Sequence, residues 1–176
     1  EALGVFEAQF AIDKWTGADE IIIQQTKANM ADCYISLGRH EEAVAMIRDA
    51  YESYVEKFGE THTETLGLAL DLAITLRQAH KNADAKSFLR GRVLIADRFL
   101  GRENMLSLRL RWVYANSLTD SADATIDDLV EAVEVLEPIA KSWKRVMGER
   151  HPETARVLSS LRHARKELRL RRAASD

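Results

Sequence analysis

The sequence predicts an all-α protein, an α-solenoid of antiparallel helix pairs, from three observations. Apolar residues make up 46% of the 176 residues and charged residues 30%, with only two prolines, a composition typical of ordered helical proteins. Glycines recur at long spacings, with Gly59 and Gly101 separated by 42 residues and Gly101 and Gly148 by 47. The segments between them each divide into two amphipathic helices, which favours stacked antiparallel pairs.

The elements follow in order along one domain, residues 1–176. A helix over 1–16 is expected to be the last helix of a preceding repeat. Helix pairs are expected over the ranges 17–58, 59–100 and 101–147, and a capping helix over 148–172. Because the chain starts at a glutamate inside a helical pattern, we expect it to be a piece of a longer protein.

Each boundary between pairs carries the same signal, a glycine followed by polar residues and then Ser or Thr. A glycine just beyond a helix can adopt the left-handed conformation that closes the last turn. In KFGETHTETL the spacing of Thr61 and Glu64 predicts a capping box with Thr61 as the N-cap. In VMGERHPETA, Pro152 is expected in the first helical turn. His62 and His151 are therefore interpreted as helix-boundary residues.

Small apolar residues at matching places predict where the helices approach one another closely. Both helices of each pair carry such an alanine: Ala31, Ala73, Ala115, Ala43, Ala85 and Ala132. Trp15 and Trp143 are expected to pack in the core. The single cysteine, Cys33, cannot form an internal disulfide and falls among core-type positions, so we expect a buried, inert thiol.

These boundaries and turns resemble the tetratricopeptide repeats of the kinesin light chain type. The matching stretches are MGERHPET, LDLAITL, LGRHEEA and, more loosely, LGRENMLS and VYANSL, and the resemblance covers residues 14–168. Where the family commonly has Asn-Asn before Leu-Ala, only Asn29 matches. The resemblance implies a right-handed, tetratricopeptide-like superhelix in which the first helix of each pair lines the concave side.

The resemblance also implies that a protein or peptide partner binds in the concave groove, whose lining positions include Gln25, Ala28 and Gly67. The residues expected to contact the partner are Asn29, Asp32, Leu70, Asp71, Ile74, Arg109, Trp112, Asn116, Arg156 and Lys166. The predicted groove has acidic residues at one end, apolar residues in the middle and basic residues at the other end. This distribution suits a peptide with apolar anchors and an acidic flank. The alternative for Trp112 is packing between repeats without contacting a ligand.

Patterns typical of catalytic and metal-binding sites are missing from the sequence. The five histidines are scattered, and there is no His-x-x-x-His, cysteine cluster, phosphate loop or G-x-S-x-G motif. We therefore expect no enzyme activity, no cofactor, no metal and no small-molecule substrate. Without an apolar run long enough to span a bilayer or a signal-peptide pattern, we expect a cytoplasmic protein.

The predicted function is a protein–protein interaction scaffold or adaptor. One alternative is the sensor or repeat region of a larger signalling ATPase, and another is a subunit or assembly factor of a large complex. A further alternative follows from uneven charge, since ten Lys or Arg residues against four acids lie from Lys144 onward. The basic segment RHARKELRLRR would then contact nucleic acid or an anionic membrane.

Overall fold

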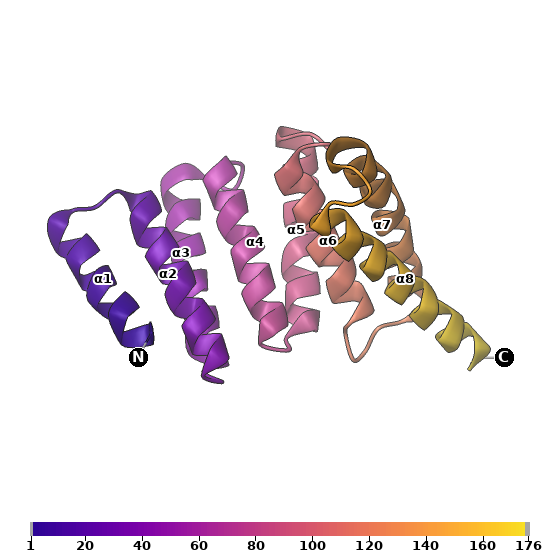
Figure 1. The fold of residues 1–176 in the computed structure, drawn as a ribbon, viewed down its shortest axis with the longest axis horizontal. Helices are drawn as coiled ribbons and strands as arrows, with labels where there is room; N and C mark the ends of the chain where they lie inside the picture. The colour runs from indigo at the N-terminus through magenta and orange to yellow at the C-terminus, as the bar shows by residue number, and fades with distance from the viewer. Residues whose placement is uncertain (1, 175–176) are drawn as a thin grey trace. The chain divides into compact units, whose positions relative to one another are not determined.

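The computed structural model describes residues 2–174, without the side chain of Ile21, and within them the chain is all-α (Figure 1). The helices are α1 (Ala2–Thr16), α2 (Glu20–Ser36), α3 (His40–Phe58), α4 (Thr63–Gln78), α5 (Asn82–Phe99), α6 (Met105–Thr119), α7 (Ile126–Met147) and α8 (Pro152–Ala173). The expected fold class is confirmed. Residues 1, 175 and 176 of the expected domain lie outside the described residues.

The described chain forms two compact units, one up to His80 and the other from Lys81 onward. In the first unit, α1 packs on α2, α2 on α3 and α3 on α4, and α2 also contacts α4. In the second unit, α5 packs on α6, α6 on α7 and α7 on α8, and α6 also contacts α8. Consecutive helices within each unit run antiparallel (Figure 1). The single-domain organisation and its repeat boundaries stay predictions.

The core of each unit is built around the small residues that the sequence pattern singled out. All six matched alanines are buried, which lets neighbouring helices approach closely. Trp143 is 0% exposed, as expected. The expectation for Trp15 is wrong, because its side chain is 88% exposed. It lies two residues beyond the buried Asp13, on the opposite side of α1 from the face that packs on α2.

The helix starts at the three predicted boundaries have N-caps of one kind, and at the first of them the N-cap is not the expected Thr61. The N-caps are His62, Asn104 and His151, all with extended backbone. In each, a side-chain acceptor receives the backbone N–H two residues later: Nδ1 of His62 at 3.3 Å, Oδ1 of Asn104 at 2.8 Å and Nδ1 of His151 at 3.2 Å. Thr61 is therefore not the N-cap, because α4 begins two residues after it, at Thr63.

Glycine is required at these boundaries, but for a conformation other than the expected one. Gly59 has φ 82° and ψ 165°, and Gly148 has φ 86° and ψ 161°. Positive φ with extended ψ is essentially restricted to glycine, whereas the left-handed helical conformation has ψ near 50°. The Gly59 N–H still donates to the Val55 carbonyl at 2.9 Å, so the last turn of α3 is closed. Pro152 opens α8, as predicted.

Candidate partner-binding surfaces

A cavity of about 300 Å³ lies between α2 and α4 in the first unit, with Tyr54 of α3 in its lining. We call it the α2–α4 cavity, and it is lined by Gln24, Gln25, Ala28, Tyr54, Glu64, Gly67, Leu68 and Asp71. Four of these residues, Gln25, Ala28, Gly67 and Asp71, occupy lining positions implied by the family resemblance. An ideal Cβ at Gly67 would meet no atom within 4 Å, so the glycine leaves open space between the helices.

One acceptor group without a hydrogen-bond partner belongs to Gln24, which lines the α2–α4 cavity. The Gln24 side chain donates through Nε2 to Glu20 Oε1 at 3.2 Å, and the other oxygen of Glu20 pairs with Lys57 Nζ at 3.4 Å. This orientation leaves Gln24 Oε1 buried without a hydrogen bond. A buried carbonyl oxygen without a donor carries a desolvation cost of about 1–3 kcal/mol. Gln24 therefore presents an unsatisfied acceptor beside the cavity.

Tyr54 adds a second polar group without a hydrogen bond. Its side chain is 4% exposed, and within the described residues no contact of its hydroxyl with a donor or acceptor is found. Burial raises the pKa of Tyr54, and the negative charges of Glu20, Glu64 and Asp19 raise it further. The potential around this hydroxyl is therefore negative, set by carboxylates of α2, α4 and the segment before α2.

The remaining predicted contact residues of the first unit do not meet in this cavity. Asn29 and Asp32 line a separate cavity of about 470 Å³ between α1 and α2, together with Cys33, which is half-buried. Leu70 is only 5% exposed, so it offers little surface to a partner, and Ile74 is half-buried. The structure thus brings together only part of the predicted set, and the cavity is completed by four residues that were not predicted as lining positions: Gln24, Tyr54, Glu64 and Leu68.

In the second unit the corresponding contact is between α6 and α8, and its polar groups bond to one another. The half-buried Trp112 donates through its indole N–H to Ser160 Oγ at 2.9 Å, and its ring meets Trp143 edge-on at 5.6 Å. His163 lies 3.3 Å from Asp120 and 3.9 Å from Glu167. We call five of these residues, Trp112, Asp120, Ser160, His163 and Glu167, the α6–α8 face. Its contacts give Trp112 a packing role whether or not it also meets a partner.

The other predicted contacts of the second unit are at its surface. Arg109, Arg156 and Lys166 are exposed, and Asn116 is half-buried. Arg156 pairs with Glu153 one turn earlier on α8 at 2.8 Å. Of the basic segment at the end of α8, Arg165 pairs with Glu137 at 2.6 Å, and Arg171 donates to the Ala124 carbonyl at 2.9 Å. Part of this basic charge is therefore used within the unit.

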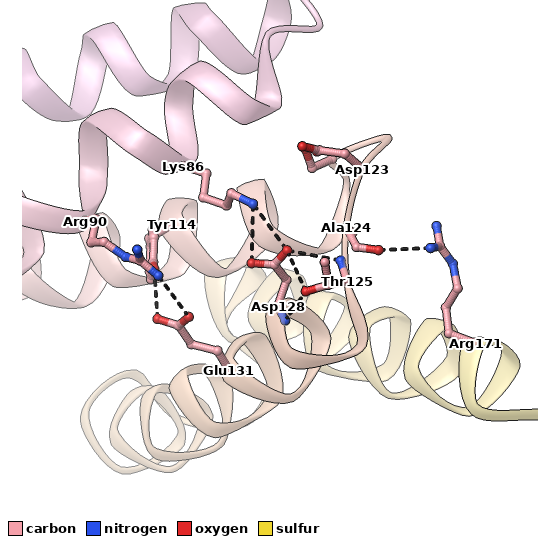
Figure 2. A network of polar contacts seen from close by, with 10 residues as sticks. Lys86, Arg90, Tyr114, Asp123, Ala124, Thr125, Asp128, Glu131 and Arg171 are labelled. Atoms are coloured by element: carbon pink, nitrogen blue, oxygen red, sulfur yellow. Dashed lines mark hydrogen bonds and ion pairs between the residues drawn. The ribbon is translucent and has the colours of Figure 1, made fainter. Parts of the chain in front are cut away.

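A network of polar contacts holds the loop between α6 and α7, residues 120–125 (Figure 2). Thr125 caps α7 in a capping box with Asp128, and Lys86 of α5 reaches both carboxylate oxygens of Asp128, at 3.2 and 3.3 Å. Burial alone would raise the pKa of Asp128, but hydrogen bonds from Thr125 and Lys86 outweigh it and hold that pKa below its ordinary value. The T-x-x-D spacing in the sequence signals this box.

Beside it in the same network, Glu131 of α7 is contacted from α6 and from α5 (Figure 2). The Tyr114 hydroxyl donates to Glu131 at 2.8 Å, and Arg90 lies 3.9 Å from the same carboxylate. Because donors and acceptors are paired in these contacts, the network stabilises the loop.

Two further properties hold for residues 2–174. No group of three or more His, Cys, Asp or Glu side chains is placed to hold a metal ion. No helix in this part of the chain combines the length and hydropathy that crossing a bilayer needs.

Comparison with known proteins agrees with this architecture. Residues 23–90 match the tetratricopeptide repeat family model. Two crystal structures of a candidate kinesin light chain from Podosopora anserina with nearly identical TPR-like repeats, one of them a single-residue variant, are 20% identical to the chain. They cover 98% of this chain and 80% of their own, with TM-scores of 0.73 and 0.71. No curated protein matches the chain. Residues 23–90 thus match tetratricopeptide repeats, and the chain shares the fold of the kinesin light chain-like repeats in these structures, in agreement with the resemblance seen in the sequence.

Proposed function

We propose that this chain is a non-catalytic scaffold or adaptor that binds a segment of a partner protein along the first helices of its pairs. Tetratricopeptide repeats in general mediate protein–protein interaction and bind proteins or peptides. The observation that carries the proposal is the α2–α4 cavity, an open space of about 300 Å³ between two such helices, lined by Gln24, whose buried Oε1 has no hydrogen-bond partner among the described residues. Such a site gains free energy when a ligand supplies the missing contacts.

The partner segment we propose is extended or helical and has apolar anchors. In the second unit the exposed Arg109, Arg156 and Lys166 favour an acidic flank on the part of the partner that meets α6 and α8. Trp112 and Ile74 are half-buried and offer apolar surface. The basic end of α8 supports contact with nucleic acid or a membrane less well, since Arg165 and Arg171 already have partners within the unit.

The test uses a displayed library of random peptides of about a dozen residues, selected on the 176-residue chain. Gly67→Trp places a large side chain in the α2–α4 cavity without backbone strain, because Gly67 is helical and a Cβ there meets nothing within 4 Å. Gly91→Trp is the matched control, since Gly91 is also helical and open to an added side chain, but belongs to α5 and is not part of the cavity lining.

We expect selected peptides to bind the wild type and Gly91→Trp alike, and to lose about tenfold or more in affinity for Gly67→Trp, measured by fluorescence anisotropy. Circular dichroism checks that both variants keep the helicity of the wild type. Selected peptides that bind all three proteins equally, or a library from which no peptide is enriched, would contradict the proposed function.

A further inference from the structure

The acceptors of the α2–α4 cavity come from all three helices that border it. Gln24 of α2 contributes a buried carbonyl oxygen without a donor. Tyr54 of α3 contributes a hydroxyl that makes no hydrogen bond in the described part of the chain. Glu64 of α4 contributes an exposed carboxylate for which no ion pair is found among the described residues. A ligand that satisfies these groups together has to be rich in hydrogen-bond donors.

The charge of the cavity has one sign. Its lining contains the carboxylates Glu64 and Asp71 and no lysine, arginine or histidine. The nearest cation on α2, Lys27, lines a different cavity together with Lys14. Lys57 of α3 is engaged with Glu20. The pKa of Tyr54 is raised first by burial and then by the charges of Glu20, Glu64 and Asp19, which agrees with the negative sign of the lining. A cation is therefore favoured in this space, and an anion is disfavoured.

The size of the cavity restricts the ligand further. About 300 Å³ is the lower end of the range for small-molecule sites, which suits one long side chain better than a cofactor. The walls close to Gly67, Ala28 and Leu68 are apolar or small and can accommodate a methylene stem, while the polar groups meet the charged end. A guanidinium carries five donors in a planar fork, and an ammonium carries three.

We propose that the α2–α4 cavity binds an arginine or lysine side chain of the partner segment, with its charged group contacting Gln24, Tyr54 and Glu64. This inference rests on the proposed function and specifies what one part of the partner must contain. It assigns a basic position to the segment that meets the first unit, which adds to the acidic flank proposed for the second.

The experiment continues with the peptides selected on the wild-type chain. Each arginine in a selected peptide is replaced in turn by citrulline, which has nearly the same shape without the charge, and each lysine by glutamine. Affinities are measured against the wild type, Tyr54→Phe and Glu64→Gln. The control Glu52→Gln/Glu56→Gln changes two exposed acids of α3 that do not line the cavity.

We expect one basic residue whose replacement weakens binding to the wild type and to the control about tenfold or more. In Tyr54→Phe and Glu64→Gln the same replacement should cost several-fold less, because part of the interaction is already missing. Tyr54→Phe should have the same melting temperature as the wild type, since the hydroxyl of Tyr54 makes no hydrogen bond in the described part of the chain.

The other outcomes separate this inference from the function on which it rests. Some peptides could lose affinity for Gly67→Trp and yet keep their affinity for the wild type when each arginine or lysine is replaced. That result would overturn the inference and leave the proposed function intact. Peptides in which the critical basic residue is equally important for the wild type, Tyr54→Phe and Glu64→Gln would also overturn it. Peptides indifferent to Gly67→Trp would overturn both.

Discussion

The α2–α4 cavity and the α6–α8 face occupy matching places in their two units but differ in how completely their polar groups are paired. In the first unit, Gln24 Oε1 is buried without a donor and the Tyr54 hydroxyl makes no hydrogen bond in the described part of the chain. In the second, the Trp112 indole bonds to Ser160, and His163 lies between two carboxylates. The same helix-pair architecture thus carries one surface where Gln24 Oε1 and the Tyr54 hydroxyl lack hydrogen bonds and one where Trp112 and His163 have polar partners.

The difference indicates which surface is organised for a ligand. A satisfied network stabilises its unit, and a partner must compete with existing bonds to use it. An unsatisfied buried acceptor costs free energy until a ligand supplies the donor. Mutations on the α6–α8 face and around its supporting network should therefore act mainly on stability, whereas mutations in the α2–α4 cavity should act mainly on binding. The predictions below test this contrast, beginning with the largest effect.

Truncation of the fully buried tryptophan should give the largest loss of stability. Trp143 is 0% exposed and contacts the ring of Trp112 edge-on, so Trp143→Ala should lower the free energy of unfolding by about 3–5 kcal/mol. Urea unfolding followed by circular dichroism measures it. The matched control is Trp15→Ala, expected within about 0.5 kcal/mol because that side chain is 88% exposed. Equal losses of unfolding free energy in the two variants would contradict the difference in burial between Trp143 and Trp15.

Loss of the carboxylate at the centre of the loop network should come next. Asp128→Ala removes the capping box and the Lys86 pair and should cost about 1–2 kcal/mol. Asp127→Ala, an exposed acid in the same first turn, should cost less than about 0.5 kcal/mol. Chemical unfolding of both variants provides the comparison, and similar costs would argue against a special role for Asp128.

The same residue gives a pH dependence with a defined sign. The folded-state pKa of Asp128 is lowered, so its contribution is complete above the ordinary pKa of about 4 and is lost as the pH falls through the lower folded value. The stability difference between wild type and Asp128→Ala should therefore be constant from neutral pH down to about 5 and shrink at more acid pH. A difference that grew on acidification would contradict the lowered pKa.

A smaller effect is expected at the helix boundary. His62→Ala removes the N-cap of α4 and should cost about 1 kcal/mol, whereas His62→Asn keeps an acceptor and should cost less than about 0.5 kcal/mol. Asn104 already performs this role at the start of α6. Thermal melts of both variants and of Thr61→Ala distinguish the two capping assignments. A loss for Thr61→Ala as large as that for His62→Ala would restore Thr61 as the cap.

The smallest expected change is a gain. Gly67→Ala and Gly91→Ala should each stabilise the chain by about 0.5–1 kcal/mol, because both glycines are helical and open to an added Cβ. Only Gly67→Ala should weaken peptide binding, since its methyl group enters the α2–α4 cavity. Parallel melting and anisotropy measurements test this separation of stability from binding. Weaker binding by Gly91→Ala would place the binding surface elsewhere.

The boundaries of the helices could be predicted because their signals are local. The backbone at Gly59, Gly148 and Pro152 has angles that few other residues adopt. The spacing of these residues therefore predicts the helix boundaries from the sequence alone. Asn104 stands at the position in its repeat that corresponds to His62, which indicates a shared capping role. Both side chains carry an acceptor close enough to the backbone to accept the N–H two residues later. The exchange of Thr61 for His62 as the cap shows that spacing alone locates a boundary only to within a residue.

The candidate site was less predictable. Gln25, Ala28, Gly67 and Asp71 reached one cavity because a helical period places them on one face of α2 or α4. Leu70, Asn29 and Asp32 do not line this cavity. The helical period of 3.6 residues predicts which residues share a face of a helix, but it does not predict which neighbouring helix packs against each part of that face. The same limit explains Trp15, whose size favours burial although it lies on the face of α1 directed away from α2.

The sequence by itself determined the class of the fold, the matched alanines where helices meet and the glycine and N-cap residues where they end, because these depend on residues within one or two turns of the chain. The tertiary structure decided which polar groups are satisfied. Gln24 is oriented through Glu20 by Lys57 from another helix, and Asp128 is held by Lys86 of α5. Such contacts join residues tens of positions apart, so only packing fixes whether a donor meets its acceptor or leaves it open for a partner.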